Sequence, residues 1–253
     1  MCCKSSKKER LNISFDVAYL RIKRAIGGEE ECFLCRLEEE NENKYVNDYL
    51  SELVMDSAAR QKIIESKGFC NYHFYKLLTA ASKPASSDGH GIALINKSII
   101  EALLRDFHKQ KVLQVSSCDK MLATENSCPI CVYIAQFSER YANKILELIS
   151  SENEEILNNL KKSRGVCIPH FVMLIHKTEV LPFQNQKIIN MLIEVEEKNL
   201  CRLHSELSEY IRRQSYEFSE KDRAAIASIV TRSVKKISGR LGIGKRIHEN
   251  RKR

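Results

Sequence analysis

The chain has 253 residues, and its 43% apolar content is enough for a buried core in one large or two small domains. It contains nine glycines, four prolines and no tryptophan, and its long Leu-, Ile-, Lys- and Glu-rich stretches lack closely spaced turn residues, so we predict an all-α fold. No run approaches the roughly eighteen apolar residues of a membrane span, and the charged start of the chain lacks the apolar core of a secretory signal. We therefore expect a cytoplasmic protein that does not use a membrane.

The formal net charge of +8 belongs to the end of the chain. Nine of the 41 basic residues and one of the 33 acidic residues lie between Arg232 and Arg253, so the rest of the chain carries equal numbers of each. A basic tail of this kind allows weak, salt-dependent contact with nucleic acid, although this one lacks interleaved aromatic residues on which bases stack.

In chain order, an N-terminal segment and helix at 1–31 lead to a CxxC motif, "CFLC" at 32–35. Apolar residues after the motif recur at the i, i+3, i+4, i+7 spacing of a helix that buries one face. A shorter helix follows and stops at a glycine, and the next helix begins inside "GFCNYH" at 68–73. A third long helix completes a unit at 32–109.

The same unit recurs after a connection at 110–127. Shifted by 96 or 97 positions, "CFLC" falls on "CPIC" at 128–131 and "GFCNYH" falls on "GVCIPH" at 165–170, and the helical spacing recurs with them. Self-similarity at a fixed period indicates an internal duplication. We predict two tandem helical repeats, the second at 128–205, each built around a metal site.

A C-terminal helical region is predicted at 206–238, with Ser219 as an N-cap and Gly239 as the stop. The apolar residues Ile226, Val230, Val234 and Ile237 continue the helix between them. A basic flexible tail at 239–253 completes the chain. Its "GRLGIGK" resembles a phosphate-binding loop only in letters, because an arginine follows where the loop needs Ser or Thr and a helix precedes where it needs a strand.

Each repeat supplies three cysteines and one histidine, the set that satisfies tetrahedral zinc. In each motif a two-residue gap lets both side chains reach one ion, and a helix N-terminus favours thiolates. The helices between the motifs are expected to return the chain to its starting point, so that each site closes within one repeat. The predicted ligands of the two zinc ions are Cys32, Cys35, Cys70 and His73 in the first repeat and Cys128, Cys131, Cys167 and His170 in the second.

Other interpretations of these eight residues differ in the chemistry that they require. Buried cysteines are good core residues in their own right, but two matched quartets favour metal. Iron–sulfur clusters stay open as an alternative, although they usually take four cysteines. Thioredoxin-like chemistry needs a βαβ context, and covalent haem needs a histidine where Arg36 and Val132 stand. A closed four-ligand site leaves no position for an activated water, which argues against an enzyme.

Several further residues recur or remain outside the motifs. Two matched acid–histidine pairs are either partners that orient the ligands or a solvated helix face: Glu101 with His108 and Glu197 with His204. Four cysteines are interpreted as spare thiols: Cys2, Cys3, Cys118 and Cys201.

With "CFLC…GFCNYH" and "CPIC…GVCIPH", the chain resembles a family of uncharacterised prokaryotic proteins classed as a domain of unknown function (6062). The resemblance covers most of residues 25–240. It implies a paired cysteine/histidine metal-site architecture in which all eight ligands named above match the pattern. It implies nothing about the basic tail and brings no established activity.

Three functional hypotheses follow. The first is a cytoplasmic helical protein with two structural zinc sites, acting as an interaction or regulatory module for an unknown protein partner. The second is an iron–sulfur redox or sensor protein that uses the same ligands. The third is a nucleic-acid binder that uses the basic tail.

Overall fold

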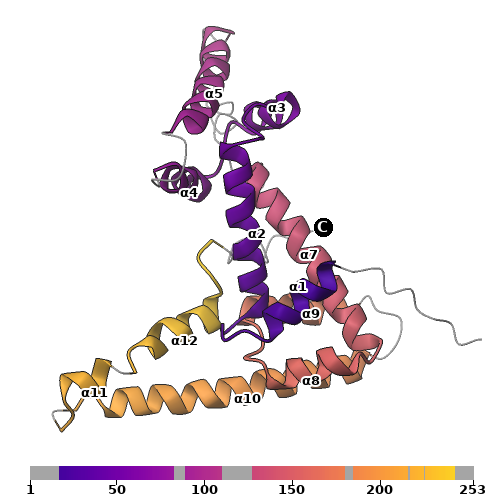
Figure 1. Ribbon diagram of the computed structural model, residues 1–253, viewed down its shortest axis with the longest axis vertical. Coiled ribbons are helices and arrows are strands. Elements are labelled where there is room, and N and C mark those ends of the chain that lie inside the picture. The colour runs from indigo at the N-terminus through magenta and orange to yellow at the C-terminus, as the bar shows by residue number, and fades with distance from the viewer. Residues whose placement is uncertain are drawn as a thin grey trace, which may run out of the picture.

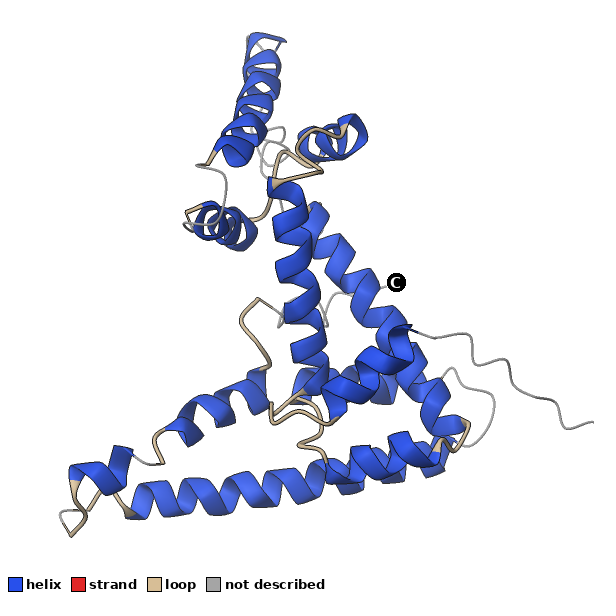
Figure 2. Cartoon of the chain, in the orientation of Figure 1, coloured by secondary structure: helices blue, strands red, loops and turns tan. Residues whose placement is uncertain are grey.

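The computed structural model describes residues 17–82, 89–109, 127–179, 185–215, 217–224 and 226–242. Every regular element in these ranges is a helix (Figure 1, Figure 2), which confirms the predicted all-α class. The helices are α1 (Val17–Ile26), α2 (Phe33–Leu50), α3 (Ser57–Glu65), α4 (Asn71–Ala81), α5 (His90–Lys109), α7 (Pro129–Ser150), α8 (Glu154–Lys162), α9 (Ile168–Thr178), α10 (Asn185–Arg212), α11 (Glu220–Ala224) and α12 (Ser228–Ser238). Most of the predicted connection at 110–127 and most of the basic tail lie outside the described residues.

Helices α2 and α7 pack side by side and run antiparallel through the middle of the molecule (Figure 1). Tyr45 of α2 stacks on Tyr133 of α7, with ring centroids 3.8 Å apart. Further along α7, Ser138 donates a hydrogen bond to Glu38, which lies earlier on α2. The start of each helix therefore lies beside the later part of the other.

Two hydrophobic cores lie at the two ends of this helix pair. The upper core combines α3, α4 and α5 with Tyr49 near the end of α2 and Ile134 near the start of α7. The lower core combines α1, α8, α9 and α10 with Leu34 at the start of α2 and Ile145 in the later part of α7. Each core therefore takes residues from both sequence repeats.

The predicted glycine stops are confirmed. Gly68 and Gly165 have φ angles of +102° and +70°, a left-handed conformation that glycine adopts at little cost. A Cβ atom at Gly68 would lie 2.7 Å from the ring of Phe74, and one at Gly165 would collide with the carboxylate of Glu196. Both turns therefore need glycine for conformation and for space, and each one delivers the chain into a CxxH motif.

The C-terminal helix differs from the prediction in its start and in its buried face. Ser219 precedes only the short α11, and α12 begins separately at Ser228. The apolar Val230, Val234 and Ile237 are 42%, 56% and 64% exposed, whereas Lys236 on the opposite face is fully buried. Helix α12 therefore docks through the apolar Ile229 together with the polar Ser233 and Lys236.

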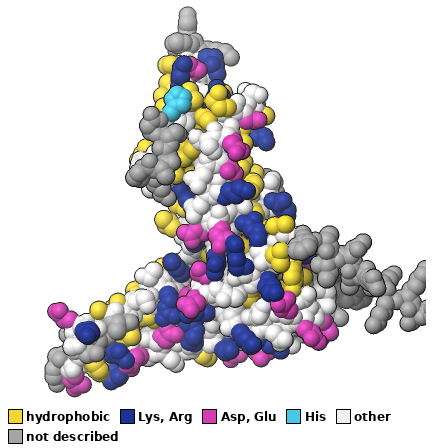
Figure 3. Space-filling model, viewed as in Figure 1, with side chains coloured by type: hydrophobic (Ala, Val, Ile, Leu, Met, Phe, Trp, Pro, Cys, Tyr) yellow, Lys and Arg dark blue, Asp and Glu magenta, His cyan; other side chains and the backbone are white. Residues whose placement is uncertain are grey.

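Acidic and basic side chains adjoin one another over the lower body of the molecule (Figure 3), in keeping with the equal numbers of both outside the tail. None of the helices that the structure describes combines the length and the apolar character of a bilayer-spanning segment.

Candidate metal centre

The structure brings the eight predicted ligands together in two clusters. Cluster A joins the CxxC motif at the start of α2 to the CxxH motif at the start of α9, and it consists of Cys32, Cys35, Cys167 and His170. The Nδ1 atom of its histidine lies 3.1 to 3.5 Å from the three sulfur atoms. Three of the four side chains are buried, and Cys35 is partly buried.

Cluster B joins the CxxH motif at the start of α4 to the CxxC motif at the start of α7. It consists of Cys70, His73, Cys128 and Cys131, all of them buried. Its histidine Nδ1 atom lies 3.2 to 3.5 Å from the three sulfur atoms, and the sulfurs of Cys70 and Cys131 are 3.6 Å apart. The two clusters thus repeat one geometry.

The predicted pairing of the motifs is wrong, because neither cluster closes within one sequence repeat. Helix α2 has 18 residues and is about 27 Å long, whereas α3 has nine residues and is about 14 Å long. Helix α3 alone covers only about half of the distance back to the CxxC motif at the start of α2. The CxxH motif of the first repeat instead meets the start of the antiparallel α7. Helices α7 and α8, with 22 and nine residues, show the same imbalance.

Each cluster lies where two helix N-termini meet. The first cysteine of every motif is the N-cap of the helix that follows: Cys32 for α2, Cys70 for α4, Cys128 for α7 and Cys167 for α9. The positive end of each helix dipole favours ionised sulfur. In cluster A the backbone N–H of Cys35 also donates to Sγ of Cys32 over 3.3 Å.

The thiols of cluster A influence one another strongly. Burial alone would raise the pKa of the Cys32 thiol, but hydrogen bonds with Cys167 and Cys35 and the nearby His170 lower it well below its usual value. Hydrogen bonds with Cys167 and Cys32 raise the pKa of Cys35, because a second thiolate beside the first is repelled. Only a cation among the sulfurs would hold all three ionised together.

The histidines of both clusters have buried carboxylate partners on α2. The Nε2 atom of His170 lies 3.1 Å from Oε1 of Glu38, and that of His73 lies 2.8 Å from Oε1 of Glu42. Burial alone would raise the pKa of each carboxyl, but the histidine and Arg240 outweigh burial and lower it. Both carboxylates are therefore acceptors that fix Nε2–H and turn Nδ1 toward the sulfurs, the arrangement that orients metal-bound histidines.

The sequence interpretation missed these carboxylates and left two other acid–histidine pairs open, as orienting partners or as a solvated helix face. Glu101, Glu197 and His204 are exposed, so the solvated-face interpretation holds for them, and the side chain of His108 lies outside the described part of the chain. A signal for the true partners was present. Cys35, Glu38 and Glu42 are spaced i, i+3, i+7, which places all three on one face of a helix that begins at a ligand.

One arginine connects the two carboxylates. Nε of Arg240 lies 3.1 Å from Oε2 of Glu38, and Nη1 lies 2.7 Å from Oε2 of Glu42. Its side chain is only 9% exposed. Lys76 also pairs with Glu42. The expectation that the chain is flexible from residue 239 onward is therefore wrong at Arg240, which is held by buried ion pairs.

The donor set and its dimensions fit zinc. Zinc–sulfur bonds of about 2.3 Å and zinc–nitrogen bonds of about 2.0–2.1 Å in a tetrahedron place the ligand atoms about 3.5–3.8 Å apart. The Cys35–Cys167 and Cys70–Cys131 sulfur atoms are 3.6 Å apart, within this range, and the sulfur–nitrogen distances of 3.1 to 3.5 Å are slightly shorter. Each cluster encloses its centre with four protein ligand atoms. Of the four thiols interpreted as spare, Cys201 is exposed on α10, and Cys2, Cys3 and Cys118 lie outside the described residues.

The fold and the clusters define an all-helical protein with two Cys3His clusters compatible with metal binding. Residues 15–242 match the model described as "Family of unknown function (DUF6062)", and the chain belongs to this family, as the motifs indicated. It is similar to the "Uncharacterized 23.9 kDa protein in xynA 3'region" of Caldicellulosiruptor sp. (strain Rt8B.4), with 25% identity over 182 residues that cover 68% of this chain and 83% of the relative. No solved structure matches the chain.

Proposed function

We propose that this protein binds two zinc ions, one in cluster A and one in cluster B, as structural cross-links between its two halves. The observation that carries the proposal is the crossed pairing of the motifs. Each cluster joins a helix of the first sequence repeat to a helix of the second, α2 to α9 and α4 to α7. A metal ion bound there would tie together chain segments 55 or more residues apart and contribute folding free energy directly.

The proposed role is structural because four protein ligands leave no open coordination position. Zinc in such a site supplies cohesion, whereas hydrolytic zinc keeps one position for water. We propose that the resulting scaffold acts in the cytoplasm as an interaction or regulatory module for a protein partner. The family and the curated relative carry no activity that would favour an enzyme.

We also propose that residues 32–109 and 128–205 derive from one duplicated unit. The order of a long helix, a nine-residue helix and an 11-residue helix that begins with CxxH occurs in both stretches, which supports this origin. In the crossed arrangement, the long helix that begins at the CxxC motif of each unit lies with the CxxH motif of the other unit. Such an exchange of long helices accounts for the crossed clusters.

The test is anaerobic purification without added metal, followed by elemental analysis and an absorption spectrum. We expect a colourless protein with about two zinc ions per chain, one for each four-ligand set. A brown protein that contains iron and sulfide would establish the iron–sulfur alternative at the same ligands. A folded protein that binds neither metal would contradict both.

A further inference from the structure

Helix α12 and Arg240, which lies two residues beyond its end, present three basic side chains at a four-residue spacing toward the metal clusters. Arg232 pairs with Glu31, the residue before Cys32, over 3.1 Å. Lys236 donates over 2.8 Å to the carbonyl oxygen of Arg164, which lies three residues before Cys167. Each contact holds chain adjoining a ligand of cluster A.

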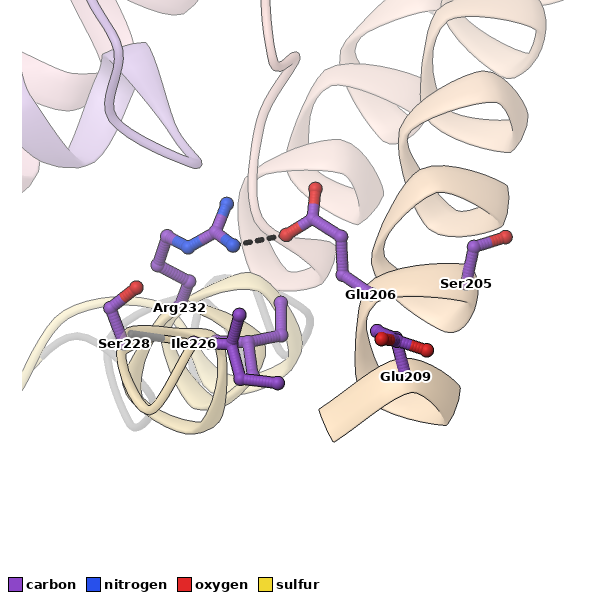
Figure 4. A pocket seen from close by; sticks show the side chains of 7 residues that line it. Ser205, Glu206, Glu209, Ile226, Ser228 and Arg232 are labelled. Carbon is purple, nitrogen blue, oxygen red and sulfur yellow. Dashed lines mark hydrogen bonds and ion pairs between the residues drawn. The ribbon is translucent and has the colours of Figure 1, made fainter. Parts of the chain in front are cut away.

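The contact surface between α12 and α10, which we call the seat of α12, contains polar pairs as well. Arg232 points across to Glu206 of α10 (Figure 4), at one side of a cavity of about 410 Å³ between the two helices. Lys236, which is fully buried, also pairs with Glu196 of α10 over 2.5 Å, and Glu196 accepts the backbone N–H of Val166. Helix α12 thus binds largely through charged contacts. The ion pairs of Arg240 with Glu38 and Glu42 follow directly after its end.

Arg240 differs from the other two residues because it touches the partners of both clusters. Glu38 and Glu42 are 2% and 0% exposed, and each one binds the histidine of a different cluster. Three thiolates exceed the charge of one zinc ion by one unit, so each carboxylate adds a negative charge beside a negative metal site. The guanidinium group has the planar fork that can bind two carboxylates at once, which an ammonium group lacks.

We propose that Arg240 is a positioning residue that couples the two metal sites through the chain His170–Glu38–Arg240–Glu42–His73. A change at one cluster alters how strongly Arg240 holds the carboxylate of the other, so the affinities of the two sites for metal depend on each other. The C-terminal segment thereby becomes part of both sites although it supplies no ligand. This inference rests on the proposed metal function.

The experiment measures the effect of Glu42→Gln, a change next to cluster B, on cluster A in the full-length protein. The chain is loaded with cadmium as an NMR probe, and the resonance of each cluster is assigned with Cys35→Ser and Cys131→Ser. We expect Glu42→Gln to shift the cluster A resonance and to change the zinc affinity of cluster A by about twofold or more, as for residues in one network. In the Arg240→Gln background this cross-effect should disappear, and both sites should bind zinc about 10-fold or more weakly.

Two variants separate coupling from the docking of α12. Arg232→Gln removes contacts of the same helix with Glu31 and Glu206, and it should preserve the cross-effect. Arg240→Lys keeps the charge without the fork, and it should restore metal binding while leaving the cross-effect reduced. If Arg240→Gln does not fold, an undiminished cross-effect in Arg240→Lys overturns the inference.

Other outcomes distinguish the two proposals. A parent protein that binds no cadmium or zinc would overturn the metal function itself. If the protein binds two ions but Glu42→Gln does not shift the cluster A resonance, the metal function stands and the coupling is overturned. A cross-effect that is the same with and without Arg240, or that Arg232→Gln abolishes equally, would also overturn it.

Discussion

At the scale of single residues, the crossed pairing of the ligands is the feature most open to a direct test. Cys32 shares a cluster with Cys167, from the other sequence repeat, and not with Cys70 from its own. Pairs of cysteine substitutions therefore give different metal contents according to which two cysteines are changed.

The double variant Cys32→Ser/Cys167→Ser removes two ligands from cluster A and should retain about one zinc ion per chain, because cluster B keeps all four ligands. Cys32→Ser/Cys70→Ser removes one ligand from each cluster and should retain clearly less than one. Elemental analysis of the purified full-length variants gives both values. The exposed Cys201→Ser is the matched control and should keep two ions. If Cys32→Ser/Cys70→Ser retained more zinc than Cys32→Ser/Cys167→Ser, the within-repeat pairing would be correct instead.

The ligands could be predicted from the sequence, whereas the residues that orient them could not be found by the same signal. The eight ligands recur at a fixed offset, so the repeat identifies them. Glu38 and Glu42 correspond to Ile134 and Ser138 in the second repeat, and Arg240 lies beyond both repeats. A search for repeated residues therefore passes over all three, and only their helical spacing from Cys35 points to the two carboxylates.

At the scale of elements, α12 shows that basic residues counted in the sequence need not contribute to a basic surface. Of the basic residues that the structure describes from Arg232 to residue 242, three are engaged with carboxylates inside the fold: Arg232, Lys236 and Arg240. The basic side chains available to nucleic acid are correspondingly fewer than the sequence suggested, and a deletion that tests the tail should start after Gly242.

The seat of α12 should weaken in acid. Burial alone would raise the pKa of Glu206, but Arg202 and Arg232 lower it. A carboxyl with a lowered folded-state pKa adds stability above its unfolded pKa of about 4.3, and this stability is lost as the pH falls through the folded pKa. From about pH 6 to about pH 4, the wild-type melting temperature should fall further than that of Glu206→Gln, because the variant lacks this contribution.

Circular dichroism at the two pH values measures this difference, and any acid loss of metal is common to both proteins. Glu197→Gln, which changes an exposed carboxylate on the same helix, should behave like the wild type. An equal fall in the wild type and in Glu206→Gln would show that Glu206 does not stabilise the seat.

The lengths of the helices could be predicted more readily than their partners. The i, i+3, i+4, i+7 spacing after the first CxxC motif correctly placed Val46 and Tyr49 on the buried face of a helix, although the last residue of the pattern, Leu53, lies beyond the end of α2. Gly68 correctly marked a stop. The long α2 and the short α3 were both implied by these positions, and α3 spans only about half of the distance back to the CxxC motif. The antiparallel contact of α2 with α7 depends on packing between distant segments, which one helix pattern does not encode.

At the scale of the whole molecule, each half is incomplete without the other. The start of α7 fills the upper core, and the start of α2 fills the lower one. Although the two motifs of each sequence repeat supply three cysteines and one histidine, these four residues are divided between the two clusters.

A chain cut within residues 110–126 tests this dependence. We expect either fragment alone to lack cooperative melting and to bind zinc weakly, because both cores and both clusters take residues from the two fragments. An equimolar mixture should form a one-to-one complex with about two zinc ions and a cooperative transition. Calorimetry and elemental analysis after size-exclusion chromatography measure the outcome. Fragments that each fold and hold one ion alone would contradict the interdigitated fold.

The exchange of α2 and α7 also governs the order in which the protein is assembled during synthesis. Cys35 leaves the ribosome 132 residues before Cys167, its partner in cluster A, whereas cluster B is complete once Cys131 has emerged. The first CxxC and CxxH motifs meanwhile form a full Cys3His set of the wrong pairing, with no second half to compete for it. Under the proposed metal function, an ion bound there early would have to be released again, or metal would have to arrive only after most of the chain has been made.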